Sequence, residues 1–363
     1  PKWQEGSRKV ETNELTVRED NSLQWVWANT INYAKDFGKH SINALIGMEA
    51  KKENGEHVQG YGRGLIIEDL DYRYLDAVTD GKDVSNNSSS YAMVSYFGKV
   101  NYAYDEKYLV SGTLRRDASS RFGNGNNSAI FPSVSAGWRI SRENFMETTS
   151  NWLSDLKLRA SWGINGNDMI DNSATYSLYY VDMNTGSYNF SGDGKTLSPG
   201  VIKTMSGNNN LKWEQTEQFN IGIDAAFLDN RLGVTMDYFK KKTKDMLIQK
   251  PYIAAIGEGG YKWYNAASMD NNGVEATITW HDKINDFNYE VAFNVSYYHN
   301  EITDLPEEVK YTWGGGDGIS KTIIGQSYGS WMAYKTDGIF RTKEEVYEYL
   351  SKYDVQVGEP GVG

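Results

Sequence analysis

Cysteine is absent from the 363 residues of this chain, so neither a disulfide framework nor a thiolate metal site can form. Histidine is scarce, and the four histidines do not follow the spacings of zinc ligands. The sequence therefore predicts no metal centre. No stretch approaches the roughly 18 uninterrupted apolar residues of a membrane helix, which excludes a helical membrane protein. A membrane barrel stays possible, because its strands alternate polar and apolar residues.

Positive charge is also in short supply, and the net charge of −11 argues against nucleic acid as a partner. Adjacent acidic residues such as Glu68-Asp69 and Glu344-Glu345 lack the desolvated setting that marks catalytic carboxylates. The glycine row at 257–260 has no strand–loop–helix context that would make it a phosphate cradle. We therefore expect no enzymatic activity and no cofactor.

Aromatic residues and glycine are abundant, with 26 Tyr, 11 Trp, 12 Phe and 36 Gly against 6 Pro, which favours strands and turns. The strongest pattern is strict alternation of apolar and polar residues. It runs through 156–164 and 219–227, and again through 287–297. Each such segment predicts a strand with one apolar face and one polar face.

Alternation of this kind predicts ten strands, several of them far longer than the five or six residues of a typical soluble strand. A tilted strand needs about 9–11 residues to cross a bilayer, so the length fits a membrane barrel. The pattern therefore predicts an all-β fold, an antiparallel transmembrane β-barrel. The predicted strands are 22–35, 39–52, 91–104, 108–118, 130–140, 153–165, 213–227, 231–247, 272–281 and 286–303.

The predicted connections alternate between short and long, as the periplasmic turns and extracellular loops of outer-membrane barrels do. Polar runs such as 86–90, 123–127 and 314–318 are interpreted as surface loops, and 343–352 as a short helix within a loop. The connection at 141–152 is longer than a tight turn and weakens the pattern. Short turns are expected at 37–39, 105–107, 228–231 and 282–285, and long loops at 53–90, 118–129, 166–212 and 248–271.

Aromatic residues gather near the expected strand ends, for example Tyr104, Tyr108, Trp152 and Phe227. Tyrosine and tryptophan favour the membrane interface, because the ring is apolar and its polar tip stays hydrated. The alternative is that these rings line the core of a soluble sandwich.

Several ordered motifs resemble the SusC/RagA family of TonB-linked outer-membrane transporters. The resemblance extends from about Trp25 to the end of the chain. The motifs are YFGKVNYAYDEKY at 96–108, RRDASSRFG at 115–123, FPSVSAGWRI at 131–140, LKLRASWGINGN at 156–167, NLKWE at 210–214, DYFKKKT at 237–243 and GSWMAYKTDGIF at 329–340.

The resemblance implies a 22-stranded barrel filled by an N-terminal plug, in the outer membrane of a Gram-negative, Bacteroidota-like cell. It implies a SusD-like surface lipoprotein, TonB as the energy-coupling partner, an oligosaccharide or peptide ligand, and a dimer of transporter–lipoprotein pairs. Because no plug, TonB box or closing strand is found, residues 1–363 are expected to be part of the barrel domain only. The alternatives are a non-transporting adhesin or structural barrel, and a soluble glycan-binding module.

Two groups of residues are candidates for ligand contact. Arg115, Arg116 and Arg121 with Asp117 are able to hold an anionic group, although a charge network at the outer rim of the lumen is the favoured interpretation. Tyr261, Trp263 and Tyr264 offer ring faces on which sugars stack, although packing of the loop or against a lid protein is favoured. No catalytic residue is predicted.

Overall fold

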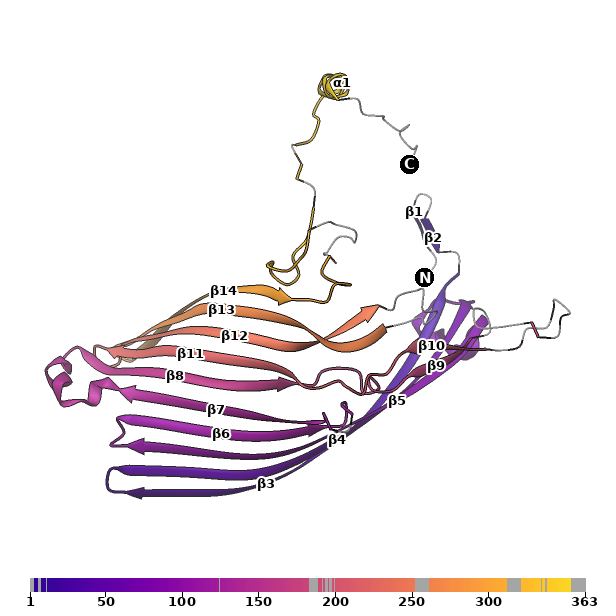
Figure 1. The fold of residues 1–363 in the computed structure, drawn as a ribbon. Helices are drawn as coiled ribbons and strands as arrows, with labels where there is room; N and C mark the ends of the chain where they lie inside the picture. The colour runs from indigo at the N-terminus through magenta and orange to yellow at the C-terminus, as the bar shows by residue number, and fades with distance from the viewer. Residues whose placement is uncertain are drawn as a thin grey trace.

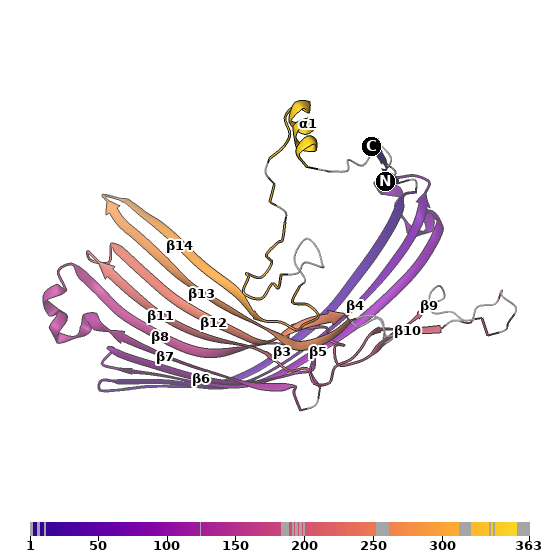
Figure 2. The same ribbon diagram turned by 45° about the horizontal axis from the view of Figure 1, so that its top comes forward.

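The structure, a computed structural model, describes all of the chain except residues 1–2, 6–7, 11, 124, 183–188, 191, 193–194, 196–197, 199, 252–260, 312–320, 334, 337 and 354–363. It is dominated by one strongly curved sheet of long strands (Figures 1 and 2). The long strands are β3 (Glu14–Phe37), β4 (His40–Leu65), β5 (Val78–Tyr104), β6 (Tyr108–Ser119), β7 (Ser128–Arg139), β8 (Leu153–Asn167), β11 (Glu214–Phe227), β12 (Leu232–Pro251), β13 (Tyr261–Ile284) and β14 (Phe287–Asp304).

All ten predicted strands are present, and each pairs antiparallel with its neighbour in chain order. A short hairpin, β9 (Leu178–Asp182) and β10 (Gly200–Met205), lies in the connection between β8 and β11 and joins the sheet through β13. β1 (Trp3–Glu5) and β2 (Arg8–Val10) pair separately. The predicted helix is α1 (Lys343–Lys352), which lies away from the sheet (Figure 1).

Two predicted loops are shorter than expected. The loop predicted at 53–90 is wrong over most of its length, because β4 continues to Leu65 and β5 begins at Val78. The polar run 86–90 is strand, and it pairs with residues 54–58 of β4. Cross-strand hydrogen bonds hold this segment without apolar alternation, which is why the sequence pattern missed it. Strand also replaces both ends of the loop predicted at 248–271.

The alternation of short turns and long connections is confirmed at most positions. Tight turns follow β3, β5, β11 and β13, and several of their residues adopt positive φ, including Gly38, Asp105 and Asn285. The connection 140–152 is longer and contains two 3-10 helices, Ile140–Arg142 and Asn144–Thr149. Backbone hydrogen bonds link neighbouring turns, as from Asp105 N to Lys39 O at 2.6 Å.

One face of the sheet is apolar and uncovered. Cross-strand rows place Phe293 beside Ile278 and Met236 beside Ile223, and these side chains are 43–61% exposed. An uncovered apolar band of this kind is the lipid-facing surface of a membrane barrel. None of the helices in the described part of the chain is long and apolar enough to cross a membrane.

The apolar rows end well before β3, β4 and β5 do. In β3 they run from Leu23 to Phe37, whereas residues 14–22 carry mostly polar and charged side chains. These three strands have 24, 26 and 27 residues, well above the roughly 9–11 that cross a bilayer. The outer parts of β3–β5 therefore form a ribbon that projects beyond the membrane on the side of the long connections (Figure 2).

Aromatic rings line the end of the sheet that carries the tight turns. Tyr104 stacks on Tyr108 with centroids 6.4 Å apart, and Trp152 stacks on Phe227 at 6.0 Å. Trp138 Nε1 donates to Glu143 at 3.0 Å. Rings with a polar partner at the boundary are the arrangement that the membrane interface favours.

Glu143 ties the connection 140–152 to this aromatic end. Hydrogen bonds from Tyr108 and then from Trp138 hold the pKa of the Glu143 carboxyl below its usual value. A lowered folded pKa adds stability above the ordinary pKa of about 4.5, and that stability is lost as the pH falls through the folded value. We expect the amide protection factors of residues 143–152 to drop between about pH 5 and pH 3. Glu143→Gln should flatten this dependence, and an unchanged pH profile in that variant would refute the assignment.

Two glycines accommodate aromatic rings from the neighbouring strand. A Cβ added to Gly166 would collide with the ring of Phe131, and one added to Gly47 would lie 2.5 Å from the ring of Phe97.

Gly166→Ala is expected to destabilise the barrel by about 2 kcal/mol, because the buried Phe131 ring must leave its place. The measurement is denaturant unfolding of the full-length protein in lipid. Gly112→Ala is the matched control, since nothing lies within 4 Å of its Cβ position. Phe131→Leu added to Gly166→Ala should recover part of the loss, and equal losses at Gly166 and Gly112 would contradict this explanation.

Candidate functional site

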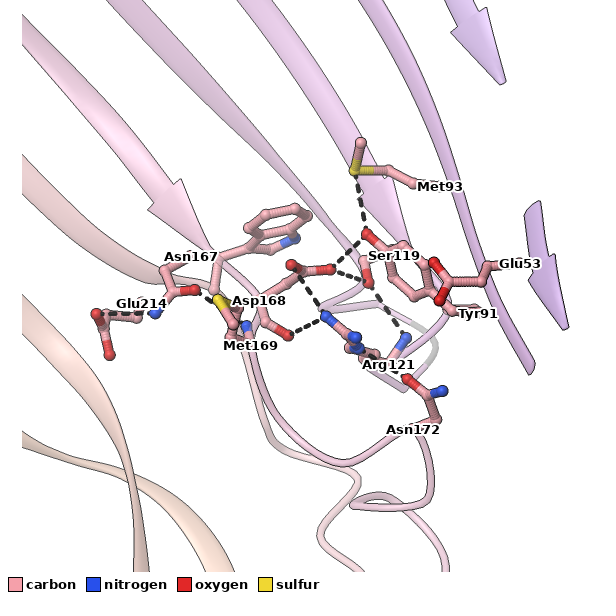
Figure 3. A network of polar contacts seen from close by, with 12 residues as sticks. Glu53, Tyr91, Met93, Ser119, Arg121, Asn167, Asp168, Met169, Asn172 and Glu214 are labelled. Atoms are coloured by element: carbon pink, nitrogen blue, oxygen red, sulfur yellow. Dashed lines mark hydrogen bonds and ion pairs between the residues drawn. The ribbon is translucent and has the colours of Figure 1, made fainter. Parts of the chain in front are cut away.

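A polar network joins the middle of β5 to the ends of β6 and β8 on the side of the long connections (Figure 3). Asp168, directly after β8, accepts hydrogen bonds from the Tyr91 hydroxyl at 2.9 Å and from Ser119 Oγ at 2.7 Å. Register places Tyr91 and Ser119 on the polar face, so the network lies at the mouth of the inner wall.

Arg121 completes this rim network. Its Nε donates to Asn172 Oδ1 at 2.8 Å, and one terminal nitrogen donates to the Asp168 carbonyl at 3.1 Å. The guanidinium carbon lies 4.2 Å from the centroid of the Tyr91 ring. Several donors of Arg121 are thus engaged within the wall, and the group fixes the start of the long connection 168–213.

An apolar cluster packs beside the rim network. Trp213 contacts Phe131 and Phe122 with centroid distances of 5.3 and 5.5 Å, and its Nε1 donates to the Asn127 carbonyl at 3.0 Å. Both ends of the connection 168–213 enter this cluster and are anchored to the wall. Its buried members are Phe122, Phe131, Ile170, Ala174, Leu211 and Trp213.

Arg115 and Asp117 form a second charge group. Arg115 Nε donates to both carboxylate oxygens of Asp117, at 2.7 and 2.9 Å, and a terminal nitrogen donates to Ser95 Oγ at 2.8 Å. The guanidinium lies 5.3 Å from the Phe97 ring centroid and 3.8 Å from Glu49. The arginines that the sequence groups together therefore lie in two separate networks. Arg115 pairs with Asp117, and Arg121 pairs with Asp168 in the rim network.

The three candidate aromatic residues differ in their surroundings. Trp263 packs on the apolar cluster, and its Nε1 donates to Asp171 at 3.2 Å. The ring of Tyr264 lies near the ammonium groups of Lys250 and Lys262, at 4.6 and 5.5 Å from its centroid. Tyr261 is 55% exposed and is the most accessible of the three. Ligand contact by these rings stays a prediction.

A charge clamp crosses three strands on the inner wall. Arg159 of β8 pairs with Asp224 of β11 at 2.8 Å and reaches over Gly222 to Asp237 of β12 at 3.0 Å. Arg159, Gly222 and Asp237 share one cross-strand row, and a Cβ at Gly222 would lie 2.8 Å from the guanidinium. The absence of a side chain at Gly222 is what opens the path for Arg159.

Sequence reasoning missed Tyr91, Ser119, Asp168 and Asn172, as well as the clamp. Ser119 and Arg159 lie within motifs quoted above, but the sequence does not reveal their partners, because these contacts join residues 49 to 78 positions apart. Among the residues that the structure describes, no group of three or more His, Cys, Asp or Glu could hold a metal ion.

Comparisons with known proteins agree on one kind of protein. Residues 6–343 match the family described as TonB dependent receptor-like, beta-barrel. The chain is 32% identical to TonB-dependent receptor P3 of Formosa agariphila, over 90% of this chain and 33% of the relative. It is 32% identical to TonB-dependent receptor SusC of Bacteroides thetaiotaomicron, over 80% of this chain and 28% of the relative.

Solved structures give the same result. The RagAB peptide transporter superposes with a TM-score of 0.73 and 29% identity, over 89% of this chain and 35% of the other. The chain thus spans about a third of the length of the curated relatives that it matches.

Proposed function

The chain belongs to the TonB-dependent receptor β-barrel family, in its SusC/RagA branch, and from this premise we propose that it forms part of the wall of an active nutrient importer. The barrel lies in the outer membrane. The observation that carries the proposal is the division of the sheet into an uncovered apolar face and a polar inner face with a fixed rim.

The proposed cargo is an oligosaccharide, with peptides as the runner-up. Residues 1–363 contribute barrel wall, and the plug and the TonB-contacting segment would come from other parts of the full protein. A SusD-like surface lipoprotein would capture the ligand over the rim network, and TonB would supply energy from the inner membrane. The role is transport without catalysis, since the curated relatives are named as receptors.

The test begins with deletion of the full-length gene in its own host. Uptake of labelled oligosaccharides and peptides should fall to background for one ligand class, and the same loss should follow disruption of TonB. Normal uptake of every ligand combined with loss of surface attachment would instead support a non-transporting adhesin.

A further inference from the structure

The ribbon formed by the outer parts of β3, β4 and β5 ends in the connection 66–77, which we call the ribbon tip. Residues 14–22 of β3 extend past the apolar rows, and at about 3.3 Å per residue they carry the tip roughly 30 Å along the strand (Figure 2). The tip contains two 3-10 helices, Leu70–Tyr72 and Leu75–Ala77. It therefore stands clear of the bilayer on the side of the long connections.

Hydrogen bonds fix the backbone of the ribbon tip. Asn13 Nδ2 donates to the Leu65 carbonyl and to Glu68 Oε1, both at 2.8 Å. The Arg73 guanidinium donates twice to the Glu68 carbonyl, at 3.1 and 3.2 Å. The tip is thus preorganised, and a partner that binds it would lose little free energy in ordering it.

The ribbon tip packs on the outer face of the ribbon, which continues the lipid-facing surface. Gly60 and Ile46 share a face, because an even number of positions separates them in the continuous strand β4, and Ile46 is 61% exposed in the apolar band. A Cβ added at Gly60 would collide with Leu75 Cδ1, so the Leu75 side chain covers this outer face. A partner that binds the tip therefore stands beside the barrel and not over its lumen.

Large apolar and aromatic side chains of the ribbon tip are exposed. Ile66 is 81% exposed, Leu70 74% and Tyr74 66%, and Ile67 and Tyr72 are at least half exposed. The bilayer does not reach these side chains, because the polar part of the ribbon separates them from the apolar rows. Exposed apolar side chains grouped in this way outside a membrane mark a site of protein interaction.

The ribbon carries most of the negative charge of the chain. Residues 14–22 and 53–90 contain 11 acidic and four basic residues, a net charge of −7 against −11 for the whole chain. Within the described residues, no ion pair engages Asp71 or Asp76 of the tip. Unpaired negative charge thus borders the exposed apolar side chains, and it favours a partner surface with basic residues around an apolar patch.

We propose that the ribbon tip docks a different surface protein, which stands beside the barrel and presents an apolar patch bordered by lysine or arginine. A second copy of this chain fits less well, because two ribbons of charge −7 would repel each other. A protein over the lumen would meet the inner face of the ribbon, whereas Leu75 places the tip on the outer face. The inference goes beyond the proposed function, since it does not depend on which nutrient is imported.

The test uses the full-length protein in its host, with the photoreactive amino acid p-benzoylphenylalanine in place of Tyr72. Irradiation of intact cells should give one discrete adduct, in which the cross-linked peptide of the partner contains lysine or arginine. Tyr176 is the control position, because it lies in the long connection 168–213 and is similarly exposed, at 66% against 56% for Tyr72.

Charge reversal then tests the chemistry of the contact. Asp71→Lys should lower the adduct yield at least fivefold, because it reverses an unpaired charge beside the exposed apolar side chains. Asp286→Lys makes the same change in the tight turn after β13, at the opposite end of the sheet, and should leave the yield within twofold. Glutamate in place of the partner's cross-linked lysine or arginine should restore the yield in Asp71→Lys.

Asp76→Lys repeats the test on the second 3-10 helix of the tip, and an unchanged rate of trypsin cleavage at Arg73 shows that the tip stays folded. The proposal would be overturned by the absence of an adduct at Tyr72, by an adduct with this protein itself or with a lipoprotein over the lumen, or by a yield that both charge reversals leave unchanged. The same adduct from Tyr176 would overturn it as well. The proposed function is judged separately, by the uptake that gene deletion abolishes.

Discussion

Arg159→Met is expected to lower the free energy of unfolding of the barrel by about 2–3 kcal/mol. The substitution leaves Asp224 and Asp237 on adjacent strands with only Lys157 nearby. Removing one partner of a buried ion pair costs about 3–5 kcal/mol, and the one-third exposure of Arg159 reduces that figure. The measurement is urea unfolding of the full-length protein in lipid nanodiscs.

Two further variants separate charge from packing. Asp237→Asn, added to Arg159→Met, should restore stability to within about 1 kcal/mol, because Asp224 keeps Lys157 as its partner at 3.7 Å and no unpaired carboxylate remains. Gly222→Val should reproduce the loss without changing any charge, since its side chain takes the path of the guanidinium. Arg116→Met is the control, because in the described part of the chain the side chain of Arg116 makes one hydrogen bond, to Ser128 Oγ at 3.0 Å, and no ion pair. A loss as large at Arg116 would show that the clamp has no special role.

Asp168→Ala is expected to release the long connection 168–213 from the mouth of the barrel. The substitution removes the acceptor for Tyr91 and Ser119 and the carboxylate beside Arg121. Losing these contacts should lower the local stability of the docked connection by about 2 kcal/mol. The fraction of molecules in which the connection is released should then rise roughly thirtyfold. Trypsin added to intact cells should cleave at Lys195, Lys203 or Lys212 correspondingly faster.

Asp171→Ala is the matched control, because its carboxylate accepts one hydrogen bond, from Trp263 at 3.2 Å. Asp168→Asn should give an intermediate rate, since it keeps an acceptor oxygen and loses the charge. Equally fast cleavage in Asp168→Ala and Asp171→Ala would show that the rim network does not anchor the connection 168–213.

Periodicity predicted the wall of the barrel because a membrane strand must alternate. Phe293 and Ile278 face lipid while their chain neighbours face the interior, and this difference is visible in sequence. Beyond the bilayer both faces of β3–β5 meet water, so the alternation fades and residues 86–90 resembled a loop. There the strand is defined by its partner, residues 54–58, and not by its own composition.

The candidate site was predicted less well for a related reason. The sequence predicts Arg115, Asp117 and Arg121 as charges at the rim, but it does not reveal which carboxylate each arginine meets. Asp168 follows β8 and meets Tyr91 of β5 only when the two strands between them, β6 and β7, bring the two residues together. The clamp likewise depends on register, since Gly222 lies between Arg159 and Asp237 only in the paired sheet.

The orientation of the wall is the central claim, because the assignments of lipid face, rim and ribbon tip all depend on it. A single cysteine placed at Asn230 or Asn285 reports on the tight turns, and one at Asn126 or Ser177 reports on the long connections. Intact cells are treated with a membrane-impermeant maleimide, before and after permeabilisation of the outer membrane. We expect labelling of Asn126→Cys and Ser177→Cys in intact cells, and of Asn230→Cys and Asn285→Cys only after permeabilisation. Labelling of the turn positions in intact cells, with protection of the long connections, would contradict it.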